Sequence, residues 1–136
     1  AGRLGAARAR VVHGSGLDEI STVGPTRVSE VAPEGVRTYD LAPADFGLAG
    51  GAAPPRVGDA AESAAIIREV LAGGTGPARD LVLVNAAATL VVAGRAANWR
   101  AGMISAAAAI DDGGAARALA RLVETSNEYR EDAEPA

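Results

Sequence analysis

The chain has 136 residues and a net charge of −4; 49% of the residues are hydrophobic and only 3% are aromatic. This length suits one domain with a single core, and an acidic chain without a basic run is a poor match to nucleic acid or anionic membranes. The absence of cysteine excludes disulfides and thiolate metal sites and favours a reducing cytoplasm.

Much of the apolar content is alanine, which buries little area per side chain, so the core is expected to be thin. A thin core is typical of a part of a larger body, and the first residue, Ala1, is not methionine. We therefore expect the chain to be one part of a longer polypeptide, with further sequence upstream.

The first third of the chain predicts strands. Residues 1–8 resemble the end of a helix, and residues 8–13 form a short strand that Gly14 ends. A strand that follows a helix indicates a parallel sheet that continues from an upstream element. Residues 26–31 and 36–41 predict a β-hairpin, because the residues between them suit a tight turn. Residues 42–57, rich in proline, glycine and alanine, predict a loop.

The rest of the chain predicts four helices. Asp59 and Glu62 have the spacing of a capping box, which begins the first helix, and Gly73 ends it. A nearly all-apolar helix follows Gly76-Pro77 and is expected to be buried. Asn98 caps a third helix that runs to about residue 110.

The double glycine at 113–114 separates the third helix from a fourth over residues 115–124. The fold class is therefore α/β, a partial parallel sheet with a β-hairpin, packed by C-terminal helices. We expect residues 1–125 to be the C-terminal part of an α/β domain and residues 126–136 to be an acidic, flexible tail.

The glycine-rich turn after the first strand is the most informative segment, because it contains the adjacent acids Asp18 and Glu19. Acidic pairs are most often solvated surface charges or helix caps. However, α/β proteins bind ligands beyond the ends of strands. Two carboxylates at such a place can hold a hard divalent cation and leave room for water and a substrate phosphate.

Other polar residues favour structural roles, and no catalytic residue is predicted. His13 has no second histidine to build a metal site and is expected to be a hydrogen-bonded structural residue. Ser15 and Ser21 lack partners for a nucleophilic triad. Asn85, in the buried helix, needs a hydrogen-bond partner in a neighbouring loop or helix. Trp99 is expected to pack in the core.

Several motifs together carry a resemblance that no single one would support. They are His13-Gly14, residues 16–21 (Gly-Leu-Asp-Glu-Ile-Ser), Gly24-Pro25-Thr26, Tyr39 with Pro43, Asp45, Phe46, Gly47 and Leu48, residues 58–62, Gly76-Pro77, Arg79-Asp80, residues 85–88, and Ile110-Asp111 with Gly113 and Ala115. With these motifs the chain, up to about residue 123, resembles the C-terminal portion of the anthranilate phosphoribosyltransferase family. The segment with Asp18 and Glu19 looks like that family's metal-binding signature.

The resemblance implies an α/β domain of the kind shared with pyrimidine nucleoside phosphorylases, joined to a small helical domain. The implied reaction is transfer of the phosphoribosyl group of phosphoribosyl pyrophosphate to anthranilate, with release of pyrophosphate, in tryptophan biosynthesis. Magnesium is the implied cofactor, with Asp18 and Glu19 as its ligands.

The family's phosphate loop and anthranilate-binding residues would lie upstream of Ala1, so the substrate-binding residues are unknown in this chain. We therefore expect this fragment alone to be inactive. The full-length parent is expected to be a cytoplasmic homodimer that binds neither nucleic acid nor membrane.

Two alternatives remain open at this stage. One is a relative of the pyrimidine nucleoside phosphorylases, which should lack the turn with Asp18 and Glu19. The other is a non-catalytic nucleic-acid-binding paralogue on the same fold, which the net charge of −4 disfavours.

Overall fold

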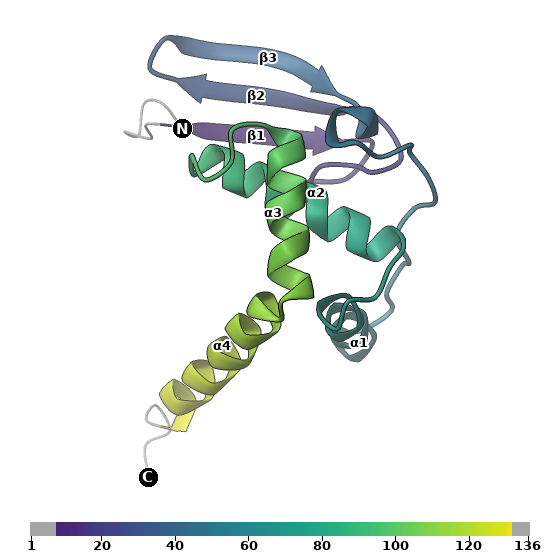
Figure 1. Cartoon of the computed structure of the whole chain (residues 1–136), viewed down its shortest axis with the longest axis vertical. Coiled ribbons are helices and arrows are strands. Elements are labelled where there is room, and N and C mark those ends of the chain that lie inside the picture. The colour runs from purple at the N-terminus through teal and green to yellow at the C-terminus, as the bar shows by residue number, and fades with distance from the viewer. Residues whose placement is uncertain (1–7, 132–136) are drawn as a thin grey trace. The chain divides into compact units, whose positions relative to one another are not determined.

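The computed structural model describes residues 8–131, which form two compact units (Figure 1). The first unit comprises the residues up to 56 together with 75–107, and the second comprises 57–74 and the residues from 108 onward. The helix end predicted over residues 1–7 lies outside the described residues. Among the helices of residues 8–131, none combines the length and the hydropathy that a bilayer crossing requires.

A three-stranded antiparallel sheet in the order β1-β2-β3 begins the first unit. Its strands are β1 (Ala9–Gly14), β2 (Thr26–Ala32) and β3 (Gly35–Leu41). The predicted hairpin is confirmed: β2 and β3 pair from Thr26 opposite Leu41 to Ala32 opposite Gly35, and only two residues connect them. Gly35 has φ +130°, a conformation that glycine adopts without strain.

Parallel pairing is not observed in the described residues, because β1 pairs antiparallel with β2, with Ala9 opposite Val31 and Gly14 opposite Thr26. The reason is the connection between these strands. Parallel neighbours need a crossover, usually a helix, whereas residues 15–25 form a compact loop that turns the chain straight back. The strands that the structure describes therefore pair only antiparallel, and the predicted parallel sheet, which was expected to continue from an upstream element, is not found among them.

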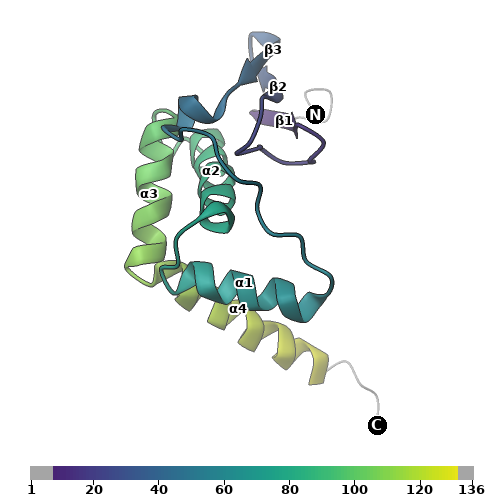
Figure 2. The same cartoon turned by 90° about the vertical axis from the view of Figure 1, so that its right-hand side faces the viewer.

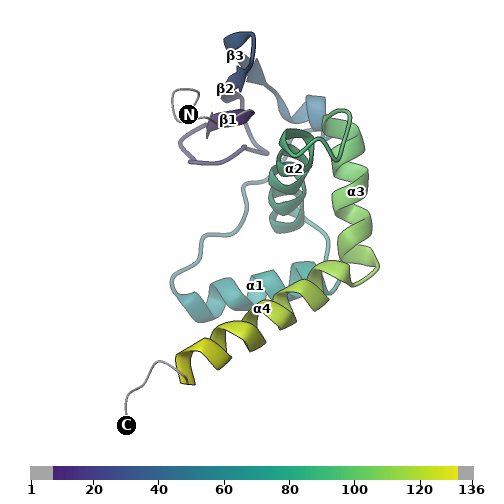
Figure 3. The same ribbon diagram turned by 90° about the vertical axis from the view of Figure 1, so that its left-hand side faces the viewer.

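Two helices of the first unit follow the sheet: α2 (Pro77–Val92) and the first part of α3 (Trp99–Asp111). Views from either side show these helices next to each other (Figures 2 and 3). Gly102 makes this approach possible, since a Cβ added there would lie 2.9 Å from the Cα of Ala87. Asn98 caps α3 as predicted, accepting a hydrogen bond from the amide of Ala101 (2.9 Å).

The core of the first unit lies between the sheet and α2. It also includes the short 3-10 helix η2 (Pro43–Phe46), which forms inside the segment predicted as a loop. The buried core residues are Ile20, Val28, Leu41, Phe46, Val84 and Ala87. Only part of α2 is buried, because Val82 remains 40% exposed, so the prediction of a buried helix holds for one face of α2.

The second unit contains α1 (Ala60–Leu71) and α4 (Gly114–Glu131), which pack against each other (Figure 2). Asp59 caps α1, and its carboxylate accepts from the amide of Glu62 (2.9 Å), as the spacing predicted. The second bond of the predicted capping box differs, because the Glu62 carboxylate accepts from the amide of Gly58 (2.7 Å). The predicted flexible tail begins too early, because α4 continues to Glu131. No glycine or proline interrupts residues 115–131, so nothing ends the helix at 125. Residues 132–136 lie outside the described part.

Candidate functional site

The acidic pair follows a tight turn that ends β1. Gly14 and Leu17 exchange backbone hydrogen bonds of 3.1 and 2.8 Å, so the chain reverses within two residues. Those two residues, Ser15 and Gly16, have φ values of 47° and 88°. Positive φ at both central positions is typical of a type I′ turn. The prediction of a tight turn at Gly14-Ser15-Gly16 is therefore confirmed. The two hydrogen bonds also hold the backbone of Leu17, the residue directly before Asp18, in place.

Ser15 also ties this turn to the end of the same loop. Its hydroxyl donates to the carbonyl oxygen of Pro25 (3.0 Å). Gly24 leaves room for this contact, because a Cβ at that position would collide with the Ser15 hydroxyl. The loop over residues 15–25 is therefore closed on itself near both of its ends.

On the other side of the acidic pair, Asn85 of α2 holds the backbone of Ile20. The Asn85 Oδ1 accepts from the Ile20 amide (3.0 Å), and its Nδ2 donates to the Ile20 carbonyl (3.3 Å) and to the Leu81 carbonyl (3.0 Å). The prediction that Asn85 bonds to a neighbouring loop is confirmed. Ile20 itself is 1% exposed and belongs to the core.

Ser21 and the residues after it continue this buried anchor. The Ser21 amide donates to the hydroxyl of Thr26 (3.0 Å), and the Ser21 hydroxyl accepts from the amide of Val23 (3.2 Å). Ser21, Thr22 and Thr26 are all buried. Sequence reasoning did not identify Thr26 as part of this anchor, although a hydroxyl residue directly after Gly24-Pro25 was a signal for a loop-closing hydrogen bond.

Asp18 is exposed and Glu19 is half-buried. No hydrogen bond or ion pair joins either carboxylate to another group among residues 8–131, so their oxygens remain available to a cation. The described residues contain no group of three or more acidic or histidine side chains that could form a metal site by itself. Two open carboxylates fit magnesium, which takes one or two carboxylates and completes its shell with water and phosphate oxygens.

Two of the remaining candidates have different outcomes. His13 is exposed, and the described residues provide no hydrogen-bond partner for its ring, so the prediction of a hydrogen-bonded histidine is wrong. Its position explains this, because Val11, on the same face of β1, is also 63% exposed. Trp99 packs as predicted, with its ring centroid 5.4 Å from that of Phe46 and the Arg10 guanidinium 4.7 Å above it.

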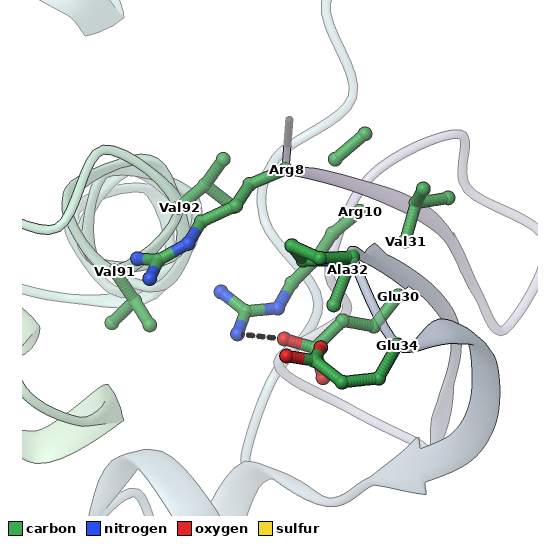
Figure 4. Close-up of a pocket in the computed structure, with 10 residues that line it drawn as sticks. Arg8, Arg10, Glu30, Val31, Ala32, Glu34, Val91 and Val92 are labelled. Carbon is green, nitrogen blue, oxygen red and sulfur yellow. Dashed lines mark hydrogen bonds and ion pairs between the residues drawn. The ribbon is translucent and has the colours of Figure 1, made fainter. Parts of the chain in front are cut away.

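A second polar region lies at the other end of β1, beside a cavity of about 250 Å³ (Figure 4). Arg10 donates to Glu30 (2.5 Å), and Arg37 donates to the other Glu30 oxygen (2.9 Å). The hydrogen bond from Arg37, with further help from Arg10, lowers the pKa of Glu30 below its ordinary value, although partial burial opposes this. This cluster links all three strands and is separate from the acidic pair.

Comparison with known proteins adds an independent line of argument. The model of the glycosyl transferase family, a/b domain, matches residues 1–116. An anthranilate phosphoribosyltransferase of Methylocella silvestris is 49% identical over 126 residues, which are 91% of this chain and 36% of that protein. The chain therefore spans about a third of the length of the curated relatives that it matches.

Solved structures agree with the sequence matches. Anthranilate phosphoribosyltransferase from Saccharomyces cerevisiae in complex with 4-fluoroanthranilate superposes with a TM-score of 0.79 at 30% identity, covering 89% of this chain and 36% of that one. The same enzyme in complex with PRPP and Mg gives 0.78 at 31%, covering 88% and 35%. The resemblance found from the sequence motifs is thus confirmed over most of the chain.

Proposed function

Because the chain belongs to the glycosyl transferase family, a/b domain, we propose that it is the C-terminal part of an anthranilate phosphoribosyltransferase. The observation that carries the proposal is the 49% identity over 91% of the chain. The proposed reaction transfers the phosphoribosyl group of phosphoribosyl pyrophosphate (PRPP) to the amine of anthranilate and releases pyrophosphate. The chain supplies one part of this enzyme, and the residues that bind both substrates lie in the remainder.

In this proposal Asp18 and Glu19 hold a magnesium ion. Support comes from their open carboxylates and from the magnesium present in structures of related enzymes. Magnesium, when bound, neutralises charge on the pyrophosphate leaving group. Asp18 and Glu19 are both anionic, so they attract a diphosphate only through a cation. Asp18 and Glu19 bind and orient the cation, and neither needs to transfer a proton.

Three finer points belong to the same proposal. The free edge of β1 accepts a parallel strand from the remainder of the enzyme, which would complete an α/β domain of the nucleoside phosphorylase type. Residues 1–125 are the C-terminal part of that domain, and residues 126–136 are an acidic segment that follows it. The complete enzyme is a homodimer in the cytoplasm, a compartment with which the absence of cysteine agrees.

The test uses a polypeptide that contains this chain and the remaining two thirds of the relatives' length. We expect magnesium-dependent formation of phosphoribosylanthranilate. The reaction is measured by the loss of anthranilate fluorescence and by the release of pyrophosphate. Replacing both acids, Asp18→Asn with Glu19→Gln, is expected to lower kcat/KM by about 100-fold, the usual size of a lost charge-stabilising contact.

Glu34→Gln is the matched control, because it removes one negative charge from the exposed turn between β2 and β3. It should leave kcat/KM unchanged. Pyrimidine nucleoside phosphorolysis without anthranilate turnover would overturn the proposal in favour of the phosphorylase relative. DNA or RNA binding without either activity would overturn it in favour of the nucleic-acid-binding paralogue.

A further inference from the structure

The acidic pair is held at both of its ends by backbone contacts. Leu17 is fixed by its two hydrogen bonds to Gly14. Ile20 is fixed by Asn85, which engages both the amide and the carbonyl of that residue. Only Asp18 and Glu19 lie between these two anchored points, so the positions of their Cα atoms depend on both anchors.

We propose that Asn85 is a positioning residue for the divalent cation: by holding the Ile20 backbone, it sets the geometry of Asp18 and Glu19 and hence their affinity for the ion. This proposal rests on the proposed magnesium site and names a residue outside the loop that governs it. Asn85 is 65 residues away in the chain and does not itself bind the ion.

The chemistry of the side chain explains why asparagine stands at this position. A primary amide accepts with its oxygen and donates with its nitrogen, which matches the amide and carbonyl of one residue. Its third hydrogen bond, to the Leu81 carbonyl one turn earlier in α2, fixes the orientation of the amide. Alanine would leave the backbone polar groups of the buried Ile20 without these partners, and aspartate would keep only the acceptor.

Amide hydrogen exchange in the 136-residue chain tests the anchor without any metal or substrate. Asn85→Ala is expected to speed exchange of the Ile20 amide by about tenfold or more, as for the loss of a hydrogen bond to a buried group. Asn85→Asp retains the acceptor and should restore much of the protection. The amide of Val28 in β2 reports whether the sheet is intact and should stay protected.

Manganese titration followed by NMR tests the link to the cation, because Mn²⁺ broadens the signals of residues near it. The wild-type chain should lose the amide signals of Asp18 and Glu19 first. Asn85→Ala should raise the Mn²⁺ concentration at half-broadening by about tenfold, the usual cost of losing a group that orients a metal ligand. Thr89→Ala removes a hydroxyl one turn further along α2 that donates to the backbone carbonyl of Asn85 (3.0 Å). It leaves the Asn85 side-chain amide in place, so it is the matched control and should match wild type.

The outcomes separate this inference from the function on which it rests. If the wild-type chain shows no selective broadening at Asp18 and Glu19, the proposed metal site and this inference are both overturned. If wild type and Asn85→Ala broaden at the same concentration, only the positioning role is overturned. Fast exchange of the Ile20 amide in the wild-type chain would also overturn it, because the anchor would then be absent.

Discussion

At the scale of single residues, the carboxylates of this chain differ in whether a positively charged side chain is paired with them. Glu30 receives two arginines and is 20% exposed in its side chain, whereas Asp18 and Glu19 have no partner among residues 8–131. The contrast is physical, because a carboxylate already paired with arginine offers few free lone pairs to a cation. The carboxylates of Asp18 and Glu19 therefore keep their lone pairs open to a ligand.

Glu30 gives a prediction about stability and pH. Its folded pKa is lowered from 4.5, first by the hydrogen bond from Arg37, so its stabilising contribution is complete above about pH 4.5 and is lost as the pH falls through the folded pKa. Glu30→Gln should lower the free energy of unfolding by about 1 kcal/mol at pH 7, typical of a partly exposed ion pair. The difference from wild type should shrink at pH 3.

The measurement is urea unfolding followed by the fluorescence of Trp99, which is the sole tryptophan and lies beside Arg10. Glu34→Gln, an exposed acid in the adjacent turn, serves as the control and should lose little stability at either pH. An equal loss for Glu30→Gln at pH 7 and pH 3 would contradict the assignment, since the effect would then not depend on ionisation.

At the scale of elements, α2 has two contacts in the first unit that limit its sequence. On one face of α2, Asn85 hydrogen-bonds to Ile20 in the loop over residues 15–25. On another face, Ala87 packs closely against Gly102 of α3. Position 85 needs a side-chain amide for the loop, and position 87 needs a small side chain for the neighbouring helix. Neither position of α2 can therefore be varied freely. The alanines at residues 86–88 supply only small side chains near the contact with α3.

Gly102→Ala tests the close approach of α2 and α3. Alanine has a helix propensity about 1 kcal/mol better than glycine, but its Cβ would lie 2.9 Å from the backbone Cα and carbonyl oxygen of Ala87. Because those atoms belong to a helix backbone, they cannot move aside as a flexible side chain would. Overpacking of this kind costs about 1–3 kcal/mol, so we expect a net loss in urea unfolding.

Gly51→Ala is the matched control, because nothing lies within 4 Å of an added Cβ there and its φ is not in the left-handed region. It should be neutral or slightly stabilising. A gain in stability for Gly102→Ala would show that the helices can separate without cost, contrary to the structure.

At the scale of the whole molecule, the chain spans about a third of the length of its relatives, and residues 8–131 contain no group of three or more possible metal ligands. Two carboxylates hold a hydrated cation weakly until a phosphate completes the shell. We therefore expect the 136-residue chain alone to have no transferase activity and no tight affinity for PRPP. Isothermal titration with magnesium and PRPP checks this.

Adding the remainder of the enzyme as a separate polypeptide gives the comparison. Activity that returns on mixing would support a site shared between the two parts. Tight PRPP binding by the chain alone would contradict the expectation, because the residues of this chain would then be sufficient for substrate binding.

Local patterns of the sequence determined the hairpin, the caps of α1 and α3, the turn at Gly14-Ser15-Gly16 and the family resemblance. The hairpin, the caps and the turn depend on residues that are near each other in the chain, where turn and cap preferences act directly. The resemblance depends on several short motifs spread along the chain, each of which can be read from the sequence. The hydrogen-bonding of Asn85 could also be foreseen, because a buried amide needs a partner, but not the identity of that partner.

Tertiary structure alone decided three things: the antiparallel pairing of β1 with β2, the contact between Asn85 and Ile20, and the approach of Gly102 to Ala87. Each joins segments whose spacing in the sequence says nothing about their distance in space. A strand carries the same pattern of side chains whether its neighbour runs parallel or antiparallel, so only the path of the loop between the strands selects one. The same path places Ile20, which directly follows Asp18 and Glu19, against Asn85 of α2, 65 residues further along the chain.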